Sequence, residues 1–315
     1  MLDLTQPGMP ESRGDYAIHQ ALSLHAQAHG VSLELLVRAA RRVSDGIVLA
    51  QSIDDFIASH QHDDAIALCA KIAIVRAITE SEARSSLALQ AKMHPRFSEI
   101  ANTWYVRLWK ILTEGADLAA LGERLASIAF IIFNYDRCVE HFFIHALQTK
   151  YGLDVIQAIQ MFSLIEIRHP YGVVGALPWQ SGAQNVPFGG SPESDKLLCL
   201  ANRIGSVAYR EGYVDKIARI SLDALRQVVA QSETLVFLGM AYHPGNLALV
   251  SPSPAQTTVR RCFGTAMGLT ESGQVDLRAR LRKFAGIGAS RVDSVGLYDA
   301  TCGEMVQTLG RALVS

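Results

Sequence analysis

The sequence predicts an α/β fold with a helical N-terminal portion, and three features of its hydrophobic pattern lead to this prediction. Residues 16–115 contain few Gly and Pro residues, and their apolar side chains recur at the spacing of an α-helix. After this segment, apolar runs at 128–133, 164–167 and 235–238 are each followed by a polar turn. Helical segments separate these runs. Because strands that alternate with helices form mostly parallel sheets, we expect a Rossmann-like sheet with helices on both faces.

The change of pattern near residue 115 divides the chain into two parts. Residues 1–115 form the mainly helical N-terminal portion and residues 116–315 form the α/β core, and we expect one continuous domain. With 315 residues, 49% of them hydrophobic, the chain is long enough to bury a large core. Residues 172–191 hold five glycines and two prolines without apolar periodicity, which predicts a long loop.

The charge balance excludes several classes of partner. The chain has 29 basic and 30 acidic residues, so we expect no direct binding to nucleic acid and no attraction to anionic membranes. No apolar stretch approaches the roughly 20 residues that a membrane-spanning helix needs. The first residues carry no apolar core of a secretory signal, and a cytoplasmic location is therefore expected.

The cysteine and histidine spacing predicts no bound metal. The five cysteines are far apart and odd in number, which fits reduced thiols better than disulfides. No Cys-x-x-Cys pair occurs, so a four-cysteine zinc site is excluded. His141 and His145 lie four residues apart on a predicted helix, but no third ligand with a supporting motif accompanies them.

Two polar residues follow the most apolar run of the chain. The carboxamide of Asn134 could hold a sugar hydroxyl or a water molecule, or it could cap the helix that follows. Both interpretations stay open. Asp136 fits a charge at the helix N-terminus better than a catalytic acid, because the helix dipole favours a carboxylate there.

His169 follows the next apolar run and precedes Pro170, which keeps its backbone extended. An imidazole titrates near neutral pH and can act as a general base, although a structural role is the alternative. His169 comes 35 residues after Asn134, enough for one helical crossover. We therefore expect both side chains in one cleft at the carboxyl ends of adjacent parallel strands, with Gly239 on its wall.

Three motifs in a fixed order carry a family resemblance. They are Phe133-Asn-Tyr-Asp136, Ile167-Arg-His-Pro-Tyr-Gly172 and Val236-Phe-Leu-Gly-Met-Ala-Tyr-His-Pro-Gly-Asn246. Together they resemble the sirtuin-like domain of bacterial NAD-hydrolysing defence proteins, and Ser52-Ile-Asp-Asp-Phe56 resembles a segment that precedes them in some members. The resemblance spans about residues 52–250, and because each motif is short, its strength lies in their order and spacing.

The resemblance implies an activity and a set of site residues. It implies hydrolysis of NAD, the substrate, to nicotinamide and ADP-ribose, in anti-phage defence. Catalysis would fall to Asn134 and His169. Cofactor-binding positions would be Asp136, Gly172, Gly239, Tyr242 and Asn246. The alternative is a catalytically inactive sirtuin-like module that binds a nucleotide or another protein. A homo-oligomer and a partner protein of a defence system both stay open.

Two departures from the family pattern bear on activity. The family opens with a Gly-Ala-Gly-x-Ser loop that cradles the NAD phosphates, and nothing like it surrounds residues 8–10. Either the domain lacks this loop or the chain begins downstream of it. The family's His usually precedes a Gly, whereas Pro170 follows His169, and alignment on Gly172 would place Tyr171 in the His position. The lack of a four-cysteine zinc module argues against a protein deacetylase.

Overall fold

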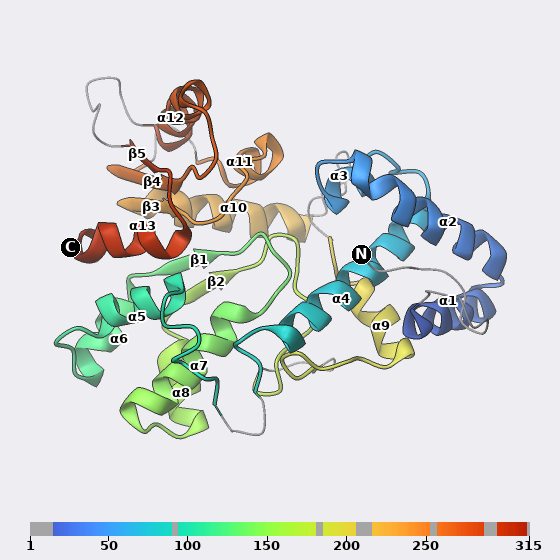
Figure 1. The fold of residues 1–315 in the computed structure, drawn as a ribbon, viewed down its shortest axis with the longest axis horizontal. Coiled ribbons are helices and arrows are strands. Elements are labelled where there is room, and N and C mark those ends of the chain that lie inside the picture. Colours follow the sequence, from blue (N-terminus) through green and yellow to red (C-terminus); the bar gives the residue numbers. More distant parts are fainter. Residues whose placement is uncertain are drawn as a thin grey trace. The chain divides into compact units, whose positions relative to one another are not determined.

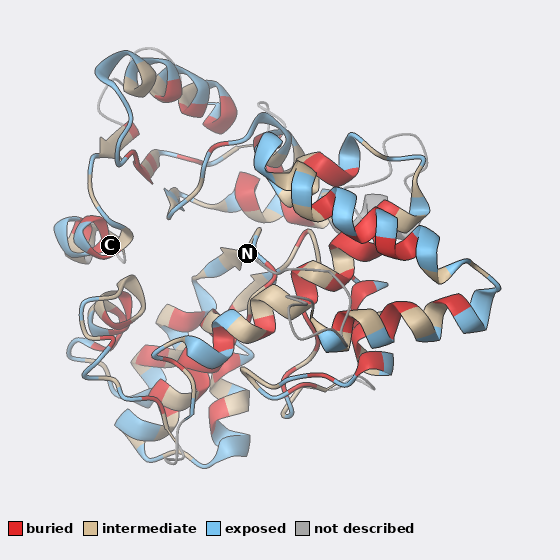
Figure 2. Ribbon diagram, turned by 45° about the vertical axis from the view of Figure 1, so that its right-hand side comes forward, coloured by how far each residue is buried: buried red, intermediate tan, exposed pale blue. Residues whose placement is uncertain are grey.

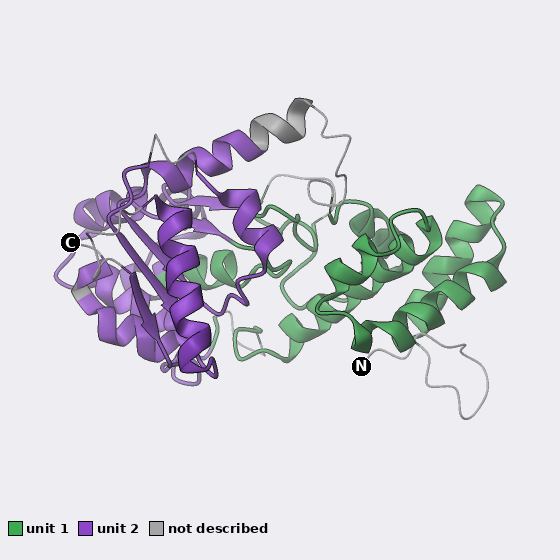
Figure 3. Cartoon of the chain, turned by 90° about the horizontal axis from the view of Figure 1, so that it is seen from above, with its two compact units in different colours: residues 1–95, 132–146, 169–213 green, residues 96–131, 147–168, 214–315 purple. Residues whose placement is uncertain are grey.

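A computed structural model describes residues 15–89, 94–180, 185–205, 216–252, 257–286 and 295–313, with backbone only for 216–221 and 311. The chain divides into two compact units, each assembled from three separate segments (Figure 3). The first unit comprises residues 1–95, 132–146 and 169–213. The second comprises residues 96–131, 147–168 and 214–315.

The first unit is built around a central helix (Figure 1). Its helices are α1 (Tyr16–His29), α2 (Leu33–Gly46), the short 3-10 helix η1 (Ile47–Leu49), α3 (Ile53–Ala58), α4 (Asp64–Arg84) and α9 (Ser194–Ala201). Helix α4 contacts α1, α2, α3 and α9. Its sequence is apolar nearly all round, which predicts a deeply placed helix, and side chains on every side of it are buried. That prediction is confirmed.

Side-chain caps explain where these helices begin. The Ser52 hydroxyl accepts a hydrogen bond from the Asp55 backbone N–H at 3.1 Å, which confirms the N-cap expected from the sequence. The carboxylate of Asp63 caps α4 in the same way. Asp15 caps α1 and also accepts a bond from Nε of Arg76 on α4 at 2.7 Å, so one carboxylate both starts a helix and ties it to its neighbour.

The second unit contains all the strands that the structure describes, and they pair in parallel. Strand β1 (Ala129–Ile131) pairs with β2 (Glu166–Arg168), and β3 (Thr234–Phe237), β4 (Arg261–Thr265) and β5 (Val295–Tyr298) form a second sheet in that order. The expected parallel pairing of an α/β fold is confirmed. Within the described ranges the strands form two short, separate sheets, so the expected Rossmann-like sheet with helices on both faces is not confirmed.

Helices of the second unit surround these strands. They are α5 (Trp104–Thr113), α6 (Leu118–Ala126), α8 (Val155–Phe162), α10 (Lys216–Gln231), α11 (Pro244–Val250), α12 (Glu271–Ala285), α13 (Cys302–Leu309) and the 3-10 helix η4 (Gly310–Leu313). Helix α12 contacts β4 and β5, and α13 contacts β4 and α5. This is the helix-on-sheet packing of a layered α/β structure.

The apolar run at 128–133 forms a shorter and less buried strand than its composition suggests. Only Ala129–Ile131 pair as strand β1, with Ala129 exposed and Phe130 and Ile131 half-buried (Figure 2). Such a continuous apolar run predicts a strand buried on both faces, and this prediction is wrong for β1. A continuous apolar run is typical of a central strand covered by helices on both faces, and a two-stranded sheet offers little surface for such cover.

Helix α7 (Cys138–Tyr151) follows β1 and contributes residues to both units. The side chains expected to form its apolar face are buried, namely Val139, Phe142, Phe143 and Ala146. The expected loop at 172–191 is confirmed for its described residues, which form neither helix nor strand apart from a single bridge. Residues 181–184 of this loop lie outside the described ranges.

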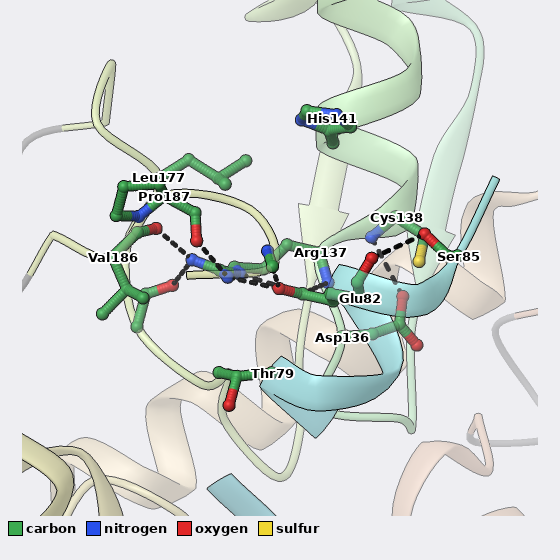
Figure 4. Close-up of polar contacts among 12 residues, drawn as sticks. Thr79, Glu82, Ser85, Asp136, Arg137, Cys138, His141, Leu177, Val186 and Pro187 are labelled. Atoms are coloured by element: carbon green, nitrogen blue, oxygen red, sulfur yellow. Dashed lines mark hydrogen bonds and ion pairs between the residues drawn. The ribbon is translucent and has the colours of Figure 1, made fainter. Parts of the chain in front are cut away.

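A buried ion pair joins three parts of the first unit (Figure 4). Arg137, just before α7, is fully buried, and Glu82 on α4 is 2% exposed. The backbone N–H and Nε of Arg137 both donate to Oε1 of Glu82 at 3.1 Å, and Nη2 donates to Oε2. This pair could not be predicted from local sequence patterns, because the two residues are 55 positions apart.

The same guanidinium holds the 172–191 loop. Its Nη1 donates to the carbonyl of Val186 at 2.5 Å, and its Nη2 donates to the carbonyl of Pro187 at 3.2 Å. The Gly189 N–H donates to Oε2 of Glu82 at 3.1 Å. Gly189 has a φ of +67°, and a Cβ there would lie 2.7 Å from the Cα of Ala83. Only glycine therefore allows the loop to approach α4 this closely.

We expect Glu82→Ala to lower the free energy of unfolding by about 3–5 kcal/mol, because it leaves the Arg137 guanidinium buried without its counter-charge. The matched control is Arg84→Ala on the same helix. The Arg84 side chain is 76% exposed and pairs with Glu80. Such an exposed pair contributes about 0–1 kcal/mol. Urea unfolding measures both changes, and equal losses in the two variants would contradict the prediction.

Candidate functional site

The two turns that the sequence singles out leave neighbouring parallel strands (Figure 1). The register pairs Ala129 with Glu166 and Ile131 with Arg168, so the chain exits β1 and β2 at the same edge. Asn134 lies three residues after β1, and His169 comes directly after β2. The expectation that these two residues follow adjacent parallel strands is confirmed.

Asn134 and Asp136 form one hydrogen-bonded turn. Nδ2 of Asn134 donates to Oδ2 of Asp136 at 2.5 Å, and Oδ1 of Asn134 accepts from the Tyr135 N–H at 3.0 Å. Oδ1 of Asp136 accepts from the Cys138 N–H at 2.9 Å, where α7 begins. Asp136 is therefore the residue that caps the helix, and the exposed Asn134 side chain is oriented by it.

The imidazole of His169 is held by a carboxylate that the sequence analysis did not single out. Nε2 of His169 lies 2.8 Å from Oε1 of Glu140, which stands in the first turn of α7. Nδ1 lies 3.4 Å from the backbone carbonyl of Asn134, at the long limit for a hydrogen bond. The side chains of His169 and Glu140 are 11% and 5% exposed. Oε2 of Glu140 is buried and has no hydrogen-bond partner within the described structure.

This geometry sets the charge of His169. Burial lowers the pKa of the imidazole, but its hydrogen bond to Glu140 and the charge of that carboxylate outweigh burial, so the pKa is raised above the usual 6.5. The carbonyl of Asn134 and the charge of Asp136 act in the same direction. At neutral pH the imidazolium form, with both nitrogens donating, is thus favoured relative to a free histidine.

Aromatic residues surround this turn. The Tyr135 hydroxyl donates to Oδ1 of Asp54 at 2.5 Å. Burial raises the pKa of the Asp54 carboxyl and, together with the Asp54 charge, the pKa of Tyr135 as well. The ring of Tyr171 lies 5.9 Å from that of Phe133 and 6.5 Å from that of Tyr135. This hydrogen bond brings the segment containing Asp54 to the Asn134 turn.

Gly172 shapes the backbone beside this site. Its φ is +85°, and a Cβ there would lie 2.9 Å from the carbonyl oxygen of Arg203. Its N–H donates to the carbonyl of His169 at 3.1 Å. The structure thus gives Gly172 a conformational reason to be a glycine, independent of any ligand.

The remaining predicted positions belong to the second unit. Gly239 has a φ of +62°, and its N–H donates to Oγ1 of Thr265 at 3.0 Å. Tyr242 has a φ of +54° and is buried, and its hydroxyl donates to the Thr265 carbonyl at 2.8 Å. A Cβ at Gly264 would lie 2.2 Å from that hydroxyl oxygen, so Gly264 makes room for the tyrosine. Asn246 lies half-buried in the first turn of α11.

A cavity of about 400 Å³ opens at the carboxyl ends of β3, β4 and β5. Gly239 and Tyr242 line it together with Thr265, Arg280 and Thr301, and Asn246 is not among the lining residues. Cavities of this size at the ends of parallel strands commonly take small molecules. From the sequence, Gly239 was expected on the wall of the Asn134–His169 cleft and Tyr242 as a binding position. Arg280 was missed, and its Nη2 donates to the Tyr242 carbonyl at 2.8 Å.

Three further features concern the cysteines, metal ligands and membrane-spanning segments. All five cysteines are free thiols. Among the described residues, no group of three or more His, Cys, Asp or Glu side chains could hold a metal ion. Every helix within the described ranges is too short or too polar to cross a lipid bilayer.

Comparison of the chain with protein-family models, with curated proteins and with solved structures finds no match. The site must therefore be interpreted from its own geometry and from the sequence motifs.

We expect Glu140→Gln to lower the pKa of His169, because the carboxylate that contributes most to raising it disappears while burial remains. An NMR titration of the imidazole measures the shift. The control is Glu166→Gln, which removes a carboxylate that is 41% exposed and paired with Arg168. It should leave the titration of His169 unchanged.

The same charge pair makes stability depend on pH. Because the folded-state pKa of His169 is raised, its stabilising contribution is complete below pH 6.5 and is lost as the pH rises through the folded-state pKa. Glu140→Gln should abolish this loss. A Glu140→Gln variant that keeps the wild-type pKa of His169 would contradict the assignment of Glu140 as its charge partner.

Proposed function

We propose that this chain hydrolyses the nicotinamide–ribose bond of NAD and releases nicotinamide and ADP-ribose. The observation that carries the proposal is the His169–Glu140 pair beside the Asn134 turn, at the exits of two adjacent parallel strands. The motif resemblance supports the choice of substrate. On this proposal the two sheets belong to a sirtuin-like, Rossmann-like fold, and the protein acts in the cytoplasm in anti-phage defence.

The chemistry needs stabilisation of positive charge and one proton acceptor. When nicotinamide leaves as a neutral base, the ribosyl carbon develops oxocarbenium character. The carboxylates of Asp136 and Glu140 lie next to Asn134 and His169, and their charge favours such a cation. Water then adds to the ribosyl carbon and loses one proton, which balances the reaction.

The neutral form of His169, with its proton on Nε2 facing Glu140, is the group that would take this proton. Glu140 holds Nε2 firmly, whereas the contact between Nδ1 and the Asn134 carbonyl is long, so Nδ1 is the nitrogen that can turn to a ligand. A carboxylate that orients an imidazole and stabilises its cation is the arrangement of catalytic triads. The unpartnered Oε2 of Glu140 offers a further acceptor for a hydroxyl or a water molecule.

Asn134 would position the reacting groups. Its exposed carboxamide is fixed by Asp136, so it can orient a ribose hydroxyl or the attacking water without large movement. Asp136 and Gly172 shape the site around it. We assign Gly239, Tyr242 and Asn246 to nucleotide binding, supported for the first two by the cavity that they line.

One observation favours the alternative of an inactive binding or interaction module. Both ring nitrogens of His169 face protein acceptors, an arrangement that also suits a purely structural tie between the two turns. On this alternative, the pair at the strand exits orders the turns, and the nucleotide is bound without being cleaved.

We expect the purified chain to release nicotinamide from NAD, and His169→Ala to lower the rate by about 100-fold or more, the usual scale for a lost general base. Asn134→Ala should have a similar effect while costing about 0.5–1.5 kcal/mol of stability, the net contribution of a typical hydrogen bond, because Asp136 and not Asn134 caps the helix. Chromatography of released nicotinamide measures the rates. The control is His62→Ala, an exposed histidine in the N-terminal portion.

Activity that is indifferent to both site variants would overturn the catalytic assignment. If calorimetry shows that NAD binds to the wild-type chain and is recovered intact, the binding-module alternative is supported instead.

A further inference from the structure

A pair of histidines outside the candidate site is unexplained by the proposed function. His145 lies on α7, and Nδ1 of His94 lies 3.3 Å from Nδ1 of His145. Their rings meet edge to face, with centroids 5.5 Å apart and planes at 77°. Both residues belong to the first unit and are half-buried.

The neighbouring His141 has a different role. Its Nε2 donates to the carbonyl of Leu87 at 3.0 Å, and its ring stacks on Phe188 with centroids 4.0 Å apart. Burial and the nearby His145 lower its pKa to about 3. His141 is thus a packed core residue. His94 was not singled out from the sequence, because it is 51 residues away from His145 along the chain.

The His94–His145 spacing matches that of two ligands on one metal ion. Zinc binds imidazole nitrogen at about 2.0–2.1 Å in tetrahedral geometry, which places two such nitrogens roughly 3.3 Å apart. Because the two Nδ1 atoms share one hydrogen bond, one of them carries the proton and the other accepts it with a lone pair.

We propose that Nδ1 of His94 and Nδ1 of His145 bind one divalent transition-metal ion of the Zn²⁺ or Ni²⁺ type, with solvent in the remaining positions. Imidazole is a preferred ligand of these ions. Without metal, one Nδ1–H donates to the other Nδ1. Metal binding requires this proton to move to Nε2 of the same ring, so no net proton is released. With two protein ligands, this is an open site and not a structural zinc centre.

Calorimetric titration of the untagged full chain with ZnCl₂ tests the proposal. We expect one ion per chain, and we expect His94→Gln and His145→Gln each to weaken binding by about ten-fold or more, at least the loss seen when a group supporting a ligand is removed. Titration with Co²⁺ should give a visible absorption band that disappears in both variants.

The control is His25→Gln. His25 and His29 stack on α1 with centroids 4.1 Å apart, and Nδ1 of His29 lies 3.1 Å from the backbone carbonyl of His25, so this surface pair controls for non-specific binding. His25→Gln should leave the Co²⁺ band in place. Binding that is lost in His25→Gln and kept in His94→Gln would overturn the proposal, as would the absence of binding to the wild type. If His145→Gln does not fold, His94→Gln alone decides.

Discussion

The buried pair of Arg137 and Glu82 is the interaction on which the first unit depends. Two ions removed from water are tolerated only when each is paired and its remaining hydrogen-bonding groups are satisfied. Here the loop carbonyls of Val186 and Pro187 and the N–H of Gly189 meet that requirement. One pair therefore fixes the relative positions of α4, the start of α7 and the 172–191 loop.

The Arg137–Glu82 pair also determines the geometry of the candidate site. Asp136 directly precedes Arg137, and Glu140 stands one helical turn after it, so both carboxylates are placed by the same buried arginine. Glu140 then orients His169, and Asp136 orients Asn134. The buried ion pair and the polar surface turn therefore form one continuous network. A substitution of Arg137 or Glu82 should change the positions of Asn134 and His169.

The sequence predicted local features well and distant partners poorly. Helix caps, the apolar face of α7 and the parallel exits of β1 and β2 follow from local spacing and periodicity, and these were found. The division into two short sheets could not be predicted, because an apolar run shows that a strand can be buried but not how many strands will pair with it. Glu140 was missed as a partner of His169, although a charged residue beside the buried Val139 was a signal that could have been used. The His94–His145 pair left no such signal.

The segmented construction of the first unit has a consequence for how the protein is made. The buried face of α1 packs against α9, whose first residue lies 165 positions after the end of α1. At about 5–20 residues per second on the ribosome, α1 waits roughly 10–30 s before its partner emerges. During that interval its apolar side chains must be shielded by other parts of the nascent chain or by chaperones. Neither unit corresponds to a contiguous stretch of the gene, so neither can be exchanged between proteins as a single cassette.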